Sequence, residues 1–158
     1  MVGYTDNDWA ENLDDRKRTF RYMFHMRSGA ISWESKKQPI VAQSTIEAEY
    51  IAANAAACQA FWLRRILIDL NKRQEDETII YCDNISSIAL SKNLVFHGRS
   101  MQIEIRYHFI RELVENEDIK MQFCKSEHWL ENNFTKPLGI ASFGCLRKNL
   151  DVVDMGQL

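Results

Sequence analysis

The chain lacks any long hydrophobic run. Its longest apolar stretches are far shorter than the ~20 residues that a helix needs to cross a bilayer. The first residues, 1–6, also lack the basic and apolar segments of a secretory signal. We therefore expect an intracellular protein without a membrane association, located in the cytoplasm or the nucleus.

Cysteine and proline are scarce, with four and two residues in a chain of 158. The cysteines are scattered, without a Cys-x-x-Cys pair or histidines at zinc-finger spacing. This pattern excludes a disulfide framework or a zinc module as the basis of the fold. It predicts reduced thiols in the core.

An excess of positive charge is also missing, because the net charge is −2. Nonspecific attraction to nucleic acid grows with the number of phosphates that a protein neutralises, so any nucleic-acid site must be local. The short basic runs are 16–18, 36–37 and 64–65. Each of them alone is better explained as a solvated turn or helix face.

The length is that of one domain, which can bury roughly 70% of its unfolded surface around a single core. We expect a single domain over residues 1–158, with its core at about 2–150 and a short tail at 151–158. There are no internal repeats, linkers or low-complexity tracts.

Apolar periodicity predicts a mixed α/β fold. Residues 20–26 alternate with the period of a strand, and a capping box at Ser44 opens a long stretch with helical spacing. An antiparallel meander should precede parallel strands, with helices packed on the sheet. The predicted strands are 2–6, 20–26, 30–34, 78–82 and 119–123. The predicted helices are 44–71, 85–92, 103–115, a short one that opens at 126–127, and 140–150.

Acidic residues end two of these strands. Asp6 is the last residue of the first strand and Asp83 directly follows the strand at 78–82, and ligands gather at the carboxyl ends of strands in such sheets. Gathered carboxylates repel one another, by roughly 1 to 4 kcal/mol for a pair ~4 Å apart. A divalent cation such as Mg²⁺ or Mn²⁺ would offset this repulsion.

Two glutamates compete for a third place in this cluster. Glu47 and Glu49 lie ~200° apart around a helix, so both cannot face the sheet. Glu47 fits the capping box, and we assign Glu49 to the cluster because it lies on the small-residue face. Taken one at a time, however, these acids could also cap helices or complement a helix dipole.

Several motifs occur in series over about 2–150. The motifs are GYTDNDWA at 3–10 followed by DDRK at 14–17, AISWESKKQP at 30–39, STIEAEYIA at 44–52, YCDN at 81–84, RYHFIRE at 106–112 and FTKPL at 134–138. In their order and spacing they resemble the ribonuclease H domain of copia-type retrotransposon polyproteins.

The resemblance implies the ribonuclease H fold, a five-stranded mixed sheet flanked by helices, and cleavage of RNA in RNA–DNA hybrids. It places Asp6, Glu49 and Asp83 at the first three metal-ligand positions of a two-metal site for Mg²⁺ or Mn²⁺. Asn132 takes the fourth position, where the family carries an aspartate. The chain also looks like a self-standing copy cut from the end of a polyprotein.

Two departures keep a second hypothesis open. Asn132 has no charge to hold the water-activating ion, and Met101-Gln102 replaces a basic pair that the family commonly carries beside the site. The chain is thus expected to be either a weakened hybrid nuclease or a catalytically inactive, domesticated module that binds a protein partner or nucleic acid.

Overall fold

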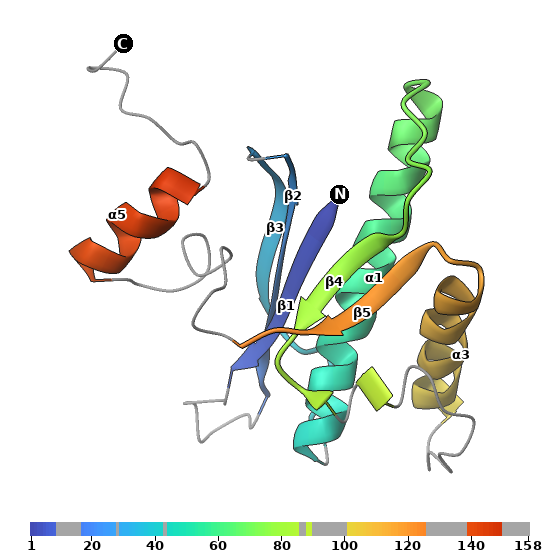
Figure 1. Ribbon diagram of the computed structural model, residues 1–158. Coiled ribbons are helices and arrows are strands. Elements are labelled where there is room, and N and C mark those ends of the chain that lie inside the picture. Colours follow the sequence, from blue (N-terminus) through green and yellow to red (C-terminus); the bar gives the residue numbers. More distant parts are fainter. Residues whose placement is uncertain are drawn as a thin grey trace.

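A computed structural model describes residues 1–8, 17–27, 29–42, 44–85, 88–89, 101–125 and 139–149. Its centre is a five-stranded sheet with the order β3-β2-β1-β4-β5. β1 pairs antiparallel with β2 and parallel with β4, β2 pairs antiparallel with β3, and β4 pairs parallel with β5. The predicted mixed sheet, a meander followed by parallel strands, is therefore confirmed (Figure 1).

The strands are β1 (Val2–Asp8), β2 (Thr19–Met26), β3 (Gly29–Lys37), β4 (Thr78–Cys82) and β5 (Ile119–Phe123). The helices are α1 (Thr45–Asp69), α3 (Met101–Glu115) and α5 (Ile140–Asn149). β1 and β3 run further than the predicted 2–6 and 30–34. Their pairing with β2 continues to Asp8 and Lys37, because backbone ladder bonds do not depend on apolar side chains.

Helix α1 packs on the sheet through small residues. It begins after Ser44, whose side-chain oxygen accepts a hydrogen bond from the Glu47 backbone N–H at 3.1 Å. Its alanines at 52, 53, 56, 57 and 60 are buried in the same core cluster as Phe24 and Ile80. The helix contacts β1, β2 and β4, and α3 packs against α1 and β5 (Figure 1).

Close packing in the sheet depends on Gly3. A β-carbon at this position would lie 2.4 Å from Cε1 of Phe24, a fully buried ring on the neighbouring strand. Atoms do not approach so closely, so the absence of a side chain allows Phe24 to lie across β1. The close packing of Phe24 on Gly3 keeps β1, the strand that carries Asp6, next to β2.

Some predictions lie outside the described residues or are wrong. The predicted helix at 85–92 is described as helical at 85 and 88–89, and the short helix at 126–127 lies outside. None of the four cysteines, all of which lie in the described residues, forms a disulfide bond, but Cys58 and Cys145 are exposed rather than in the core, because they lie on solvent-facing parts of α1 and α5. None of the described helices is long and apolar enough to cross a membrane.

Candidate metal centre

Asp6 and Asp83 hold equivalent positions, Asp6 within β1 and Asp83 directly after β4, the parallel neighbour of β1. β1 and β4 pair up to Tyr4 and Tyr81, and each aspartate lies two residues beyond its tyrosine. The tyrosine ring centroids are 5.3 Å apart, so the two side chains share one face of the sheet. Because side chains alternate along a strand, the two aspartates are brought to one place at the carboxyl ends of the strands.

Helix α1 adds a third carboxylate from its start. One oxygen from each of Asp6, Glu49 and Asp83 lies within 4.8 Å of the others. Asp6 and Glu49 are buried, at 6% and 8% exposure, whereas Asp83 is exposed. The cluster therefore has an inner side that is closed by the protein and an outer side that is open to solvent.

The structure separates the two competing glutamates. Glu49 is in the cluster, and Glu47 lies outside it with its backbone N–H bound by the cap residue Ser44. This is the arrangement expected from the ~200° between them on the helix. That the gathered carboxylates bind metal stays a prediction.

Burial and like charge make Glu49 unusually basic. Burial contributes most, and the nearby carboxylates of Asp83 and Asp6 add to it, so that the pKa of Glu49 rises from 4.5 to about 8. The side chain of Asn7 and the guanidinium of Arg18 oppose this rise. In the absence of a cation, the cluster thus keeps a proton on Glu49 near neutral pH.

A network of hydrogen bonds connects Asp6 of the cluster to the residues around it. Asp6 Oδ1 accepts a bond from the Asn7 backbone N–H at 2.7 Å. Gln38, at 1% exposure, donates from Nε2 to Asn7 Oδ1 at 3.1 Å and to the Ala48 carbonyl at 2.8 Å. Gln38 therefore links the ends of β1 and β3 to the first turn of α1. Sequence reasoning missed it, and its place between a lysine pair and Pro39 offers no distinctive signal.

The donor set fits a small, hard divalent cation. All three groups offer carboxylate oxygens, the ligands that Mg²⁺ and Mn²⁺ prefer, and Mg²⁺ commonly takes one or two protein carboxylates plus water and phosphate oxygens. The open side at Asp83 leaves room for such further ligands. The fourth predicted position, Asn132, lies outside the described residues, as do the side chains of Met101 and Gln102.

Comparison with solved structures defines the class of the fold. LC11-RNase H1, solved in complex with an RNA/DNA hybrid, matches with a TM-score of 0.55 and 13% identity over 80% of this chain and 86% of that chain. The N-terminal RNase H domain of a Mycobacterium tuberculosis protein matches with a TM-score of 0.55 and 11% identity, over 93% and 96% of the two chains. The fold is therefore that of ribonuclease H.

Sequence comparison then gives the family. The chain is 49% identical, over 77% of its length, to the retrovirus-related Pol polyprotein from transposon TNT 1-94 of Nicotiana tabacum. It is 33% identical, over 97% of its length, to that from transposon RE2 of Arabidopsis thaliana. It belongs with these retrotransposon Pol polyproteins, as its motifs predicted, and spans 9% and 10% of their lengths. No family model matches the chain.

Proposed function

We propose that the chain is a divalent-metal-dependent endoribonuclease that cleaves the RNA strand of RNA–DNA hybrids. The observation that carries this proposal is the convergence of Asp6, Glu49 and Asp83 within 4.8 Å at the carboxyl ends of β1 and β4. Two comparisons support it: the relatives are transposon Pol polyproteins, and one fold neighbour was solved with an RNA/DNA hybrid.

In this proposal the three carboxylates hold Mg²⁺ or Mn²⁺. When bound, such ions orient an attacking water and stabilise the leaving oxygen of a phosphodiester. The residues of the chain prepare this chemistry. The Asn7 backbone N–H fixes Asp6, and Glu49 releases its proton to become a ligand, which Asn7 and Arg18 favour. The exposed Asp83 marks the side from which the substrate approaches.

A matched pair of glutamate variants tests the proposal. Purified wild type, Glu49→Gln and Glu47→Gln are incubated with a labelled RNA–DNA hybrid in Mg²⁺ and in Mn²⁺. We expect cleavage by wild type and by Glu47→Gln. Glu49→Gln should be slower by about 100-fold or more, since a metal contributes several kcal/mol to such a reaction. Equal rates for the two variants would refute the assignment of the site.

Asn132 favours a second candidate function, a catalytically inactive module that binds a hybrid or a protein partner. An amide can ligate a metal but adds no charge, so the water-activating ion would be weakly held. Asn132→Asp separates the candidates. A strong rise in hybrid cleavage means an otherwise competent site, and continued silence of both forms means that the loss of the nuclease site extends beyond this one residue, which favours the binding module.

The proposed substrate also bears on location. A retroelement-type hybrid nuclease would act where RNA–DNA hybrids occur, in the cytoplasm or the nucleus. Fractionation of cells that express a tagged chain would test this part of the proposal. Recovery only from the medium would contradict it.

A further inference from the structure

Four cationic residues lie at the end of the sheet where the carboxylates gather. These cations lie in two segments, residues 17–20 at the start of β2 and residues 35–42 at and beyond the end of β3. Neither segment contains an acidic residue. The end of β3 pairs with the start of β2, Lys37 opposite Thr19 and Lys36 opposite Phe20. We call this group the basic edge, and its members are Lys17, Arg18, Lys36 and Lys37.

Two of these cations are held in place by neighbouring acceptors. Lys17 donates from Nζ to the Pro39 carbonyl at 3.1 Å, and Arg18 donates from Nη2 to Thr45 Oγ1 at 3.2 Å. The Arg18 carbonyl accepts a bond from the Gln38 backbone N–H at 2.7 Å. The basic edge is thus joined to the segment that leads into α1, and Lys36 and Lys37 are exposed beside it.

The sheet register places the basic edge near the metal centre. Phe20 lies between Lys36 and Asn7, the residue after Asp6, in one row across β3, β2 and β1. Strands are ~4.8 Å apart, so the Cα atoms of Lys36 and Asn7 are separated by about 10 Å. Gln38 connects the same two strand ends by its bond to Asn7. Long lysine side chains at this distance can reach phosphates close to the bond that is cleaved.

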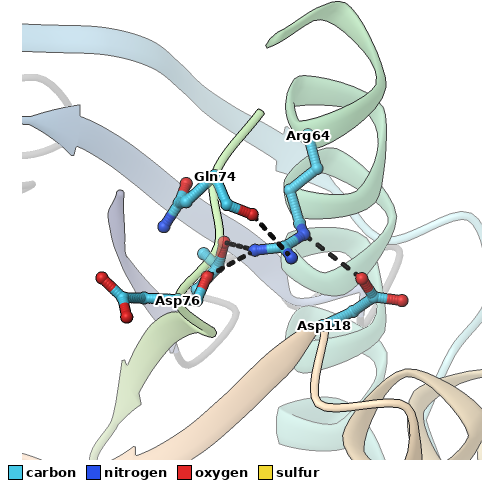
Figure 2. A network of polar contacts seen from close by, with 5 residues as sticks. Arg64, Gln74, Asp76 and Asp118 are labelled. Carbon is cyan, nitrogen blue, oxygen red and sulfur yellow. Dashed lines mark hydrogen bonds and ion pairs between the residues drawn. The ribbon is translucent and has the colours of Figure 1, made fainter. Parts of the chain in front are cut away.

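The other arginine-rich place in the described structure has a structural explanation. Arg64, Arg65 and Arg73 help to line a cavity of about 160 Å³ at the far end of α1. Arg64 pairs with Asp118 at 3.3 Å and donates to the Asp76 carbonyl at 2.8 Å, which ties the start of β5 to α1 (Figure 2). Arg65 lies over the Phe61 ring, 5.1 Å from its centroid.

We propose that the basic edge binds the phosphodiester backbone of the hybrid a few nucleotides from the carboxylate cluster. Phosphates recur every ~3.4 Å of helix axis on each strand, so a ~10 Å offset corresponds to about three of them. The cations there offset the repulsion between phosphates and a site made of carboxylates. In a chain with a net charge of −2, they concentrate attraction where the substrate must lie. The identity of the substrate rests on the proposed function.

The test compares two double variants that remove equal charge. Lys36→Gln/Lys37→Gln changes the basic edge, and Lys72→Gln/Arg73→Gln changes exposed residues just beyond α1, at its opposite end. Binding of a fluorescent RNA–DNA hybrid is measured in EDTA between 50 and 200 mM salt. We expect the first variant to bind about tenfold more weakly and to reduce the slope of log affinity against log salt by about 1 to 2. The control should keep the wild-type slope.

Cleavage measurements separate this inference from the proposed function. If wild type binds the hybrid without cleaving it, and the lysine variant alone loses affinity, the basic edge is upheld while the nuclease assignment fails. If wild type cleaves, the lysine variant should show a raised KM and an unchanged kcat. Equal binding and equal salt slopes for the two double variants would overturn the inference, and so would a wild-type chain that binds no hybrid.

Discussion

Gln38 and Asn7 join the ends of two strands through a buried hydrogen bond of 3.1 Å between Gln38 Nε2 and Asn7 Oδ1. The residues are 31 positions apart in the sequence, and Asn7 also donates its backbone N–H to Asp6 Oδ1 in the carboxylate cluster. The same Gln38 nitrogen also donates to the Ala48 carbonyl in the first turn of α1. The carboxylate cluster is therefore supported by a polar contact that no local sequence pattern predicts.

Loss of this contact should cost stability. We expect Gln38→Ala to lower the free energy of unfolding by about 1 to 3 kcal/mol, because it leaves Asn7 Oδ1 and the Ala48 carbonyl without this donor. Gln59→Ala is the matched control. Gln59 bonds Ser32 at 2.9 Å between α1 and β3, in a less buried place, and should cost less. Urea denaturation measures both, and a larger loss for Gln59→Ala would contradict the assignment.

The architecture could be predicted because its signals are local. Strand alternation in 20–26, the apolar run at 78–82 and the cap at Ser44 each lie within one element, and the observed elements begin and end close to the predicted ones. The aspartates follow from strand ends, and Glu49 follows from helix geometry. The predicted helix at 44–71 runs past the observed end, since α1 ends at Asp69 and Leu70 is 62% exposed.

Contacts between distant segments could not be predicted in this way. Gln38 is a polar residue after two lysines, and its burial arises when β3 continues to Lys37 beside β2. The closeness of Lys36 to Asn7 likewise depends on the register of three strands, which residue types alone do not specify. The structure therefore contributes most where separate strand ends meet around the site.

A methyl group at Gly3 should disturb the sheet. Gly3→Ala would place its β-carbon 2.4 Å from Cε1 of Phe24, which is fully buried and has little room to move. We expect a loss of about 1 to 3 kcal/mol from overpacking. Gly29→Ala, whose β-carbon would meet its nearest atom at 3.9 Å, should change stability far less. Thermal unfolding of both variants measures the difference.

A second substitution shows whether the ring is the cause. Phe24→Leu removes Cε1 and Cζ, two of the three ring atoms that the new β-carbon would meet, so Gly3→Ala should cost less in that background than in wild type. Equal costs in the two backgrounds would mean that another contact limits this position.

The metal-free chain should lose stability as pH rises. The pKa of Glu49 is about 8 in the folded chain and near 4.5 when unfolded, so the folded state holds this proton more tightly. The contribution of this bound proton to the free energy of unfolding is fully present below pH 4.5 and declines as pH rises towards 8. We expect a loss of about 3 to 5 kcal/mol over this range, because the pKa differs by about 3.5 between the folded and unfolded chain and one pKa unit corresponds to ~1.4 kcal/mol.

Two glutamine variants check the source of this pH dependence. Urea denaturation in EDTA across pH 5 to 8 should show the decline in wild type and in Glu47→Gln, since Glu47 lies outside the cluster. Glu49→Gln cannot titrate, so its profile should be flatter by the same amount. A profile for Glu49→Gln as steep as that of wild type would assign the titration to other groups.

Mg²⁺ should stabilise the chain and displace a proton at the same time. A ligand that binds only the folded state at ten times its Kd adds about 1.4 kcal/mol to the free energy of unfolding. Because Glu49 keeps its proton near neutral pH, binding of the cation through its carboxylate must release that proton. Calorimetric titration at pH 7 in two buffers with different ionisation enthalpies measures this release. We expect close to one proton for wild type and almost none for Glu49→Gln.

Asp83→Asn removes an exposed ligand rather than the titrating group, so it should weaken binding while the remaining binding still releases the proton. Binding with equal proton release in wild type and Glu49→Gln would place the cation elsewhere.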